Sequence, residues 1–428
     1  MSASSPMASA ATPIAPSSEL ERLFAIQRTA FESERYSDHA KRQDLLRRML
    51  TLTVAHEQEW VDAIAADFGH RSAHETRLAE CYVVAAAARH ALTHLAQWMK
   101  PRRVRTPLHL QPARAYLLRQ PVGVVGIISP WNYPLQLALA PALAALAAGN
   151  RVLLKPSELT PALAALMAQK VRAYFSEDEL AVVPGDAGVG QAFTTMRFDH
   201  LFFTGSTAVG RLVARAAAEN LTPVTLELGG KSPALFDTDA QFAVAAPRLM
   251  AGKLLNAGQT CIAPDYALVQ VEQRASFVEA VSAATSALYP TISGNDDYTA
   301  IVNDRHYHRL QRLVADARQK GAAVITLSPP GETPPERTRK FPPTLLVGVD
   351  DSMAVMQEEI FGPVLPIETY DTIDEALRRI NARPRPLAFY YFGNNAARRR
   401  HVLEQTIAGG VTVNDTMWHF AHEGLPFG

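Results

Sequence analysis

The chain has 428 residues, of which 48% are hydrophobic and 20% charged, so it is long and apolar enough for two or three globular domains. Lys and Arg together number 42, as do Asp and Glu, and this balance gives no indication of nucleic acid or of an anionic membrane surface as a partner. Two cysteines cannot build a disulfide framework, which favours a reducing cytoplasm.

The first 18 residues are rich in Ser, Ala and Pro and lack the charged start and apolar core of a signal peptide. We predict a disordered arm there. Residues 20–98 read as helices, with one long helix from Glu75 to Met99. No apolar run is long enough to span a membrane, since the best, residues 135–148, is short and interrupted.

Residues 107–120 change character, because apolar and polar side chains interleave in the pattern of a half-buried strand pair. The basic cluster that precedes them, Arg102, Arg103 and Arg105, is interpreted as a solvated loop.

Strands and helices then alternate up to residue 229, which predicts a parallel sheet with helices on its faces. Strands are expected at 122–129, 151–154, 201–203 and 224–228. Pro134 opens a helix that Gly149 closes, and Thr160 with Pro161 predicts the cap and first residue of the next helix.

A second alternating unit is expected after residue 230. Its predicted helices cover 242–256, 277–288, 307–320, 373–382 and 396–406, and its predicted strands cover 266–271, 323–327, 387–392 and 411–414. Residues 328–343 are rich in Pro, Gly and charge and are expected to form a surface loop.

Three short motifs carry chemistry. Residues 256–261 read Asn-Ala-Gly-Gln-Thr-Cys and set the Cys261 thiol on a flexible, Gly-assisted turn, although a lone cysteine is as often a small buried hydrophobe. Glu227 sits between two leucines, a setting that raises a carboxyl pKa towards the range of a base. Asn132 is fixed between two prolines. Nucleophile, base and amide donor are the parts of covalent acyl chemistry, whereas the structural alternatives are a salt-bridged Glu227 and a turn amide.

Gly205 and Gly210 follow a predicted strand and enter a helix, the geometry that offers backbone N–H groups to a phosphate. The full Gly-x-Gly-x-x-Gly fingerprint is absent, so this signal is weak by itself.

The three motifs, in this order and spacing, resemble the aldehyde dehydrogenase superfamily from about Leu20 to the last residue. Residues 97–103 and 413–416 are most similar to the coniferyl-aldehyde dehydrogenase branch. The resemblance implies two doubly wound Rossmann-like α/β domains: a cofactor domain of residues 19–106 and 121–229, and a catalytic domain of residues 230–418. It also implies a projecting β-hairpin of residues 107–120 that assembles a homodimer or homotetramer.

By the same resemblance the chain oxidises an aromatic aldehyde, such as coniferyl aldehyde, or a medium-chain aliphatic one to the carboxylic acid, using NAD(P). Cys261 would form the thiohemiacetal and thioester, Asn132 would hold the oxygen anion and Glu227 would activate water. Lys155 and Glu158 would contact the adenosine ribose, where a carboxylate repels a 2′-phosphate; this favours NAD, with NADP possible.

The remaining cofactor residues that the resemblance implies are Trp131, Ser157, Gly188, Gly205, Ser206, Gly210, Leu228, Glu359 and Phe361. Tyr133, Trp418 and His419 are expected along the aldehyde tunnel. No metal is expected, because His419 has no cysteine or acid at metal-ligand spacing.

Two alternatives stay open. One is a cysteine hydrolase or acyltransferase, which shares the nucleophile but needs no dinucleotide. The other is a weakly active or non-catalytic relative: residues 419–428 read as the start of a C-terminal segment that continues for several tens of residues in the family. On that reading we expect the 428-residue form to be less stable and to assemble less well than a longer one.

Overall fold

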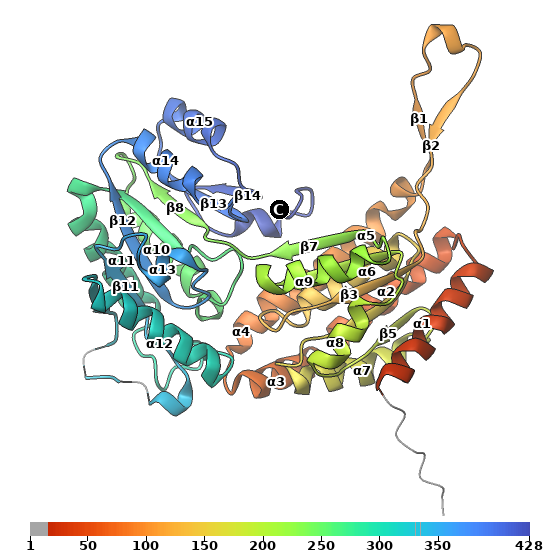
Figure 1. The fold of residues 1–428 in the computed structure, drawn as a ribbon, viewed down its shortest axis with the longest axis horizontal. Coiled ribbons are helices and arrows are strands. Elements are labelled where there is room, and N and C mark those ends of the chain that lie inside the picture. Colours follow the sequence, from red (N-terminus) through yellow and green to blue (C-terminus); the bar gives the residue numbers. More distant parts are fainter. Residues whose placement is uncertain (1–15, 330, 334) are drawn as a thin grey trace, which may run out of the picture.

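The computed structural model describes residues 16–329, 331–333 and 335–428. Two α/β units, each around its own sheet, lie side by side, and a two-stranded hairpin projects from one of them (Figure 1). The chain passes from strand β7 of the first sheet to strand β8 of the second through residues 229–232. The predicted α/β fold with a projecting hairpin is confirmed.

The N-terminal helices pack beside the first sheet. Residues 1–15 of the predicted disordered arm lie outside the described residues, but the prediction is wrong for residues 16–18, since helix α1 begins at Pro16. Leu20 and Leu23 are buried, and this burial stabilises a helix that composition alone did not favour. The helices are α1 (Pro16–Ser33), α2 (His39–Ala55), α3 (Glu57–Phe68), α4 (Ala73–Thr76), the π-helix η1 (Arg77–Tyr82) and α5 (Val83–Trp98).

The predicted long helix is continuous, but it contains a π-helical segment that its sequence did not indicate. Segments α4, η1 and α5 follow one another without a gap, and η1 is the π-helical one. One extra residue per turn rotates the face presented after it by about 100°.

The hairpin differs from its prediction in the bounds and the exposure of its strands. Strand β1 (Arg102–Val104) pairs antiparallel with β2 (Ala115–Leu117), and the short 3₁₀-helix η2 (Leu108–Leu110) lies between them. Arg102 and Arg103 are therefore part of a strand, not of a loop. Every residue of both strands is exposed, rather than half-buried, because the hairpin projects away from the body.

The first sheet has five parallel strands in the order β5-β4-β3-β6-β7. The direction of winding reverses between β3 and β6, and such a switch point is where open α/β sheets bind their ligands. The strands are β3 (Val124–Ile128), β4 (Arg151–Lys155), β5 (Leu180–Val182), β6 (His200–Gly205) and β7 (Val224–Leu228), and the helices are α6 (Gln136–Ala147), α7 (Pro161–Tyr174), α8 (Ala187–Thr194) and α9 (Thr207–Ala218).

Separate apolar cores fill the two faces of this sheet. One contains residues of α2, α5, α6 and α7, and the other contains residues of α1, α8 and α9. Helices on both faces make the sheet doubly wound.

The second sheet has seven strands in the order β10-β11-β12-β9-β8-β13-β14, parallel except for the β10–β11 pair. The sequence pattern did not single out β8, β11 or β12. The strands are β8 (Pro233–Phe236), β9 (Tyr266–Gln270), β10 (Ala323–Thr326), β11 (Thr344–Val347), β12 (Val364–Tyr370), β13 (Ala388–Phe392) and β14 (Gly410–Val413).

The helical segments of this second unit cover its sheet and its connections. They are α10 (Phe242–Leu254), η3 (Leu255–Gly258), η4 (Val271–Gln273), α11 (Arg274–Leu288), α12 (Asp304–Gln319), η5 (Glu336–Thr338), α13 (Ala354–Gln357), α14 (Ile373–Ala382), α15 (Ala396–Gln405) and η6 (Trp418–Ala421).

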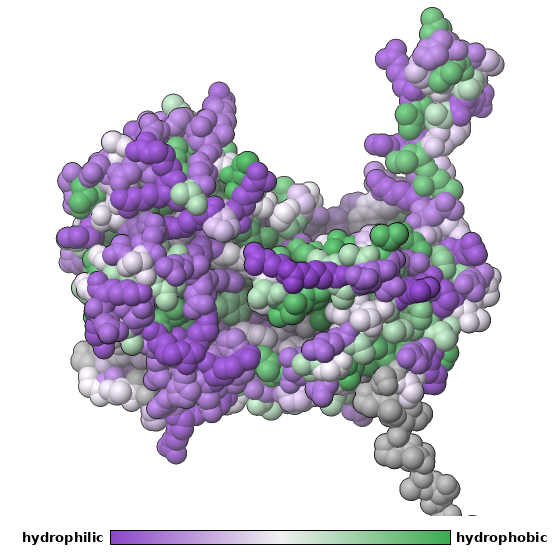
Figure 2. Space-filling model, in the orientation of Figure 1, coloured by the Kyte–Doolittle hydropathy of each residue, from purple (hydrophilic) through white to green (hydrophobic). Residues whose placement is uncertain are grey.

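Apolar and polar residues mix along the hairpin surface (Figure 2). Leu108, Leu110 and Tyr116 are each more than half exposed there. Among the described residues, no helix is both long and apolar enough to cross a membrane.

Candidate active site

Cys261 follows a left-handed turn, which replaces the flexible turn that the sequence suggested. Asn256, Ala257 and Gly258 have φ angles of 53°, 51° and 75°. A non-glycine residue in this region costs on the order of 1–3 kcal/mol, so the surroundings must hold the turn in place.

Buried side-chain amides hold it. Asn256 Nδ2 donates to the carbonyl oxygens of Asn132 and Gln259, at 2.9 and 3.2 Å. Gln259 Nε2 donates to the carbonyl oxygens of Asn256 and Ala300, at 2.9 and 3.0 Å. Both side chains belong to residues with no exposed surface. The turn that presents the thiol is therefore rigid.

Asn132 lies against this turn. It is 3% exposed, and its Nδ2 donates to the Gln259 carbonyl oxygen at 3.1 Å. An amide nitrogen carries two hydrogens, so one remains for a ligand. The structure thus places the predicted amide donor against Gln259, two residues before Cys261.

Glu227 belongs to the first sheet, and its carboxylate lies near the Cys261 thiol of the second unit. It is half-buried at the carboxyl end of β7, and burial raises the pKa of its carboxyl to about 7. Burial, together with the nearby Glu359 and Glu227 carboxylates, raises the pKa of the Cys261 thiol to about 12. The backbone N–H groups of Cys261 and Ile262 lower this pKa, but by less than burial raises it. The thiol is therefore protonated at neutral pH and needs a base, and a half-ionised Glu227 is suited to that role.

The loops of both sheets meet at an aromatic contact. The rings of Trp131 and Phe361 lie edge to face with centroids 5.4 Å apart. Glu359 is also in this region, and burial with the nearby Asp265 raises the pKa of its carboxyl to about 8. A Cβ on Gly229 would lie 2.1 Å from the Glu359 carboxylate, so a larger residue there would displace this carboxylate.

The predicted phosphate-binding turn leads into helix α9. Ser206 caps helix α9, and its Oγ accepts from the Val209 N–H at 3.4 Å. A Cβ on Gly210 would lie 2.8 Å from the Leu228 side chain, so this glycine lets α9 close onto strand β7. Gly188 lies instead in the first turn of α8, which Asp186 caps.

Lys155 and Glu158 lie together at the carboxyl end of β4. Lys155 is buried, and its Nζ lies 3.3 Å from Glu158 Oε2. Ser157 is buried beside them, and its Oγ accepts from the Leu159 N–H at 3.2 Å.

The sequence matches the pattern of the "Aldehyde dehydrogenase family" over residues 5–428. The chain belongs to the aldehyde dehydrogenase family. It is 51% identical to the "Probable coniferyl aldehyde dehydrogenase" of Caulobacter vibrioides over 392 residues, 91% of this chain and 81% of that one.

Two solved aldehyde dehydrogenases have the same fold. The substrate-bound Staphylococcus aureus AldH aligns with a TM-score of 0.91 at 38% identity, covering 96% of this chain and 88% of that one. The Mycobacterium tuberculosis aldehyde dehydrogenase complexed with NAD+ aligns with a TM-score of 0.84 at 29% identity, covering 95% and 84%.

The predicted enzyme class is thereby confirmed: the chain is an NAD(P)-dependent oxidoreductase that converts aldehydes to acids. The similarity to coniferyl aldehyde dehydrogenases is confirmed as well. The comparisons do not favour the cysteine hydrolase or the non-catalytic relative.

The predicted tunnel residues of this aldehyde dehydrogenase lie in different environments. Tyr133 is buried, and its hydroxyl lies 2.7 Å from Thr260 Oγ1, next to Cys261. His419 is also buried and bonds to Thr412 Oγ1 at 2.9 Å. Trp418 is 67% exposed, so within this chain it does not lie in an enclosed tunnel.

Sequence reasoning missed the buried residues behind the site, above all Arg71, Glu75 and Glu80. One signal was available for Glu80, because it shares a helical stripe with the buried residues Val84 and Ala88. A charged residue in a core-facing position is rarely buried without a partner. Nothing in the sequence distinguished Arg71 from a surface arginine.

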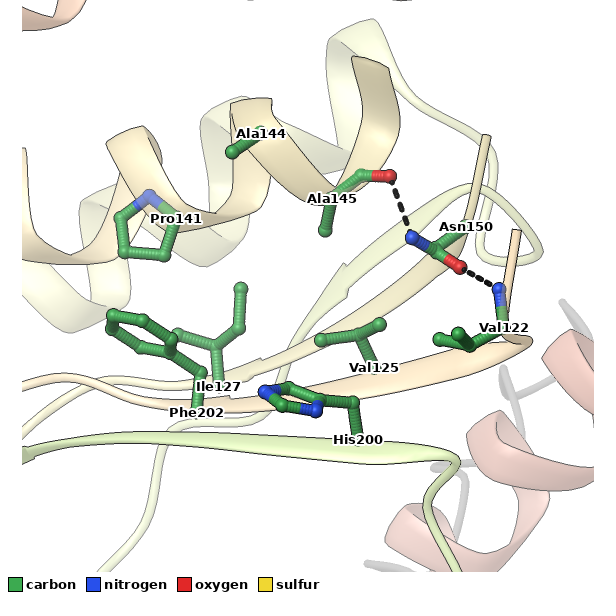
Figure 3. A pocket seen from close by; sticks show the side chains of 9 residues that line it. All are labelled: Val122, Val125, Ile127, Pro141, Ala144, Ala145, Asn150, His200 and Phe202. Carbon is green, nitrogen blue, oxygen red and sulfur yellow. Dashed lines mark hydrogen bonds between the residues drawn. The ribbon is translucent and has the colours of Figure 1, made fainter. Parts of the chain in front are cut away.

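A cavity in this aldehyde dehydrogenase lies apart from the candidate active-site residues. It has a volume of about 210 Å³ between α6 and the strands β3 and β6. Its lining is mostly apolar, with Asn150 and His200 as polar members (Figure 3). It contains none of the predicted site residues.

Proposed function

We propose that the chain oxidises an aromatic aldehyde of the coniferyl type to its carboxylic acid with NAD. The observation that carries this proposal is the approach of Asn132 and Glu227 to the Cys261 turn from separate elements. The aromatic substrate is supported by the names of the most similar relatives. A medium-chain aliphatic aldehyde is the second candidate.

The first half-reaction acylates the cysteine. Glu227 takes the Cys261 proton, and the sulfur forms a bond to the carbonyl carbon while the π electrons move to the oxygen. The second N–H of the Asn132 amide, together with the Cys261 backbone N–H, stabilises this oxygen anion. Bound nicotinamide supplies the acceptor for the hydride. Loss of the hydride from carbon restores the C=O bond and leaves a thioester on Cys261.

The second half-reaction releases the acid. Glu227 first releases the cysteine proton to solvent, which is the net proton that the oxidation produces. The unprotonated Glu227 then removes a proton from water as the water oxygen attacks the thioester carbon, and it returns this proton to the departing sulfur. The C–S bond then breaks, and the acid leaves with the cysteine restored. A base with a pKa of about 7 is suited to both steps, because it accepts and returns a proton near neutral pH.

The chain's residues fit a dinucleotide. The buried atoms Glu359 Oε1 and Thr204 Oγ1 lack a protein hydrogen-bond partner in the described part of the chain, as groups that meet ligand hydroxyls would. Ser206 and Gly205 would face the phosphates, Lys155 and Glu158 the adenosine ribose, and Glu359 the nicotinamide ribose. Trp131, Ser157, Gly188, Gly210, Leu228 and Phe361 complete the proposed contacts.

We further propose the predicted organisation of the chain: a cofactor domain, a catalytic domain after residue 229, and a hairpin that joins copies into a homodimer or homotetramer. The exposed apolar residues of the hairpin support the assembly. A reducing cytoplasm suits the two free cysteines.

The test is the absorbance of reduced nicotinamide with coniferyl aldehyde, benzaldehyde and hexanal, each with NAD and with NADP. We expect the highest kcat/KM with coniferyl aldehyde and NAD. A preference for hexanal would contradict the aromatic substrate, and no turnover with any aldehyde would contradict the proposed reaction.

A further inference from the structure

One short and largely buried stretch, residues 71–80, contacts both halves of the proposed site. It comprises the residues before helix α4, α4 itself and the start of the π-helix η1. In Figure 1, α4 lies between the two sheet units. Arg71, Glu75 and Glu80 are 3%, 7% and 0% exposed, and each has an ionisable side chain. Such residues are rarely buried unless they are paired, so their contacts indicate their role.

On one side the stretch holds the Asn132 segment. Arg71 Nη1 donates to the Asn132 carbonyl oxygen at 2.9 Å, and the guanidinium lies over the rings of Phe68 and Tyr133, 5.0 and 4.9 Å from their centroids. Arg71 also pairs with Glu80 at 2.9 Å.

Glu80 fixes the same segment further along the chain. Its Oε2 accepts from the N–H groups of Leu135 and Gln136, at 2.7 and 3.1 Å, which caps helix α6. The backbone is therefore fixed both at Asn132 and three residues after it. A charged acceptor at a helix N-terminus also matches the helix dipole.

On the other side the stretch holds the cysteine turn. Glu75 Oε1 accepts from the Asn256 N–H at 2.8 Å, at the first left-handed residue of the turn. Glu75 Oε2 accepts from Thr299 Oγ1 at 2.5 Å. Without this acceptor the Asn256 N–H would be buried and unpaired at a strained residue, which favours relaxation of the turn.

We infer that Arg71, Glu75 and Glu80 are positioning residues that fix the separation of the Asn132 amide from the Cys261 thiol. The π-helical turn contributes, because its extra residue rotates the chain that follows Glu75 and so changes the direction in which Glu80 points. The inference rests on the proposed roles of Asn132 and Cys261. None of the three residues contacts the thiol, so they act through the backbone that carries the reacting groups.

The test compares Glu75→Leu, which removes the acceptor, with Glu75→Gln, which keeps an oxygen for the Asn256 N–H. Rapid mixing with saturating NAD and aldehyde measures the first-turnover burst. We expect Glu75→Leu to slow the burst about a hundredfold, since a misplacement of 1 Å can cost that much. Glu75→Gln should stay within about threefold of the wild type, and NAD affinity should be unchanged in both.

Glu368→Leu is the matched control, because it removes another buried carboxylate, on β12 in the other unit. It should lower the melting temperature without slowing the burst. Should Glu75→Leu fail to fold, Thr299→Val removes the second partner of Glu75 with little change in shape, and a slower burst is again expected. A wild-type burst rate in the folded variant, or equal slowing by Glu75→Leu and Glu75→Gln, would overturn the inference.

A second measurement is independent of turnover. Amide hydrogen exchange over residues 255–261 should be faster in Glu75→Leu than in the wild type, and unchanged in Glu368→Leu. Unchanged exchange overturns the inference even if no aldehyde is oxidised. Absence of wild-type turnover, by contrast, bears on the proposed function alone.

Discussion

At the scale of single residues, the most direct test of the proposed reaction is replacement of the Cys261 thiol. Cys261→Ser should abolish aldehyde oxidation and leave NAD binding intact, because a serine hydroxyl ionises far less readily than a thiol. Turnover is measured by reduced nicotinamide and binding by titration calorimetry. Cys81→Ala is the control, since Cys81 is buried within η1. Substantial turnover by the serine variant would refute Cys261 as nucleophile.

Glu227 makes the burst depend on pH. Its pKa is raised to about 7, so its unprotonated, base form grows as pH rises through 7, and the wild-type burst should rise over that range. In Glu227→Gln this rise should disappear. The burst should instead increase steadily towards alkaline pH, following ionisation of a thiol with a pKa of about 12.

Stopped-flow traces from pH 6 to 10 measure this dependence, with Glu219→Gln as a control because Glu219 is exposed. A full burst in Glu227→Gln at neutral pH would show that the thiol ionises without Glu227. The carboxylate would then act on water alone, as the sequence suggested.

Glu158 should set the choice of cofactor. Glu158→Gln removes a negative charge expected to face a 2′-phosphate, an effect of about 1 kcal/mol at a partly exposed site. The ratio of kcat/KM for NADP to that for NAD should rise about fivefold. Glu177→Gln, an exposed carboxylate paired with Arg22, should leave the ratio unchanged. If Glu158→Gln also leaves it unchanged, Glu158 does not face the ribose.

At the scale of elements, helix α7 is capped from a distance. The sequence suggested Thr160, yet that side chain makes no capping bond. Asp67, at the end of α3, accepts from the N–H groups of Ala162 and Leu163 at 2.8 and 2.9 Å. Long-range capping leaves no local pattern, so only the fold reveals it.

Asp67→Ala should therefore lower the free energy of unfolding by about 1–2 kcal/mol, the usual cost of a lost cap. Thr160→Val, which removes only the hydroxyl, should lower it by less than about 0.5 kcal/mol. Urea unfolding followed by circular dichroism compares the two. The reverse order would return the capping role to Thr160.

The predictable elements were those with a strong local period. The run at 122–129 and the helix at 242–256 lie close to their observed bounds, because the strand buries a continuous apolar run and the helix buries one apolar face. The left-handed turn was not predictable, since Asn256 and Ala257 are not residues that demand positive φ. Its conformation depends on Glu75 and Gln259, which contact it only after folding.

At the scale of the whole molecule, charge is unevenly distributed. Residues 100–120 contain six Lys and Arg and no Asp or Glu, which leaves 36 basic against 42 acidic residues elsewhere. A positive hairpin and a negative body attract each other across copies. Assembly should therefore weaken as salt shortens the Debye length from about 8 Å at 0.15 M to 3 Å at 1 M.

Light scattering across this salt range measures the assembly. A variant with Arg102→Ser and Arg103→Ser should form smaller particles at 0.15 M salt, whereas Arg399→Ser with Arg400→Ser, on helix α15, should not. Salt-independent size in the wild type would show that apolar contacts alone hold the copies together.

The motifs indicated which side chains react, but not how two sheets bring them together. Glu227 ends a strand of the first sheet, and Cys261 follows helix α10 beside the second. Residues 229–232 carry the chain between the sheets. The sequence does not show this arrangement, because it depends on how the two folded sheets are placed beside each other.

A site formed between two sheet units is sensitive to any change in the contact between these units. Slight loosening between the two units would separate the base from the nucleophile while each sheet kept its own core. Inactivation under mild heat or dilute denaturant should thus precede loss of helical signal. The enzyme would fail as a catalyst while still appearing folded.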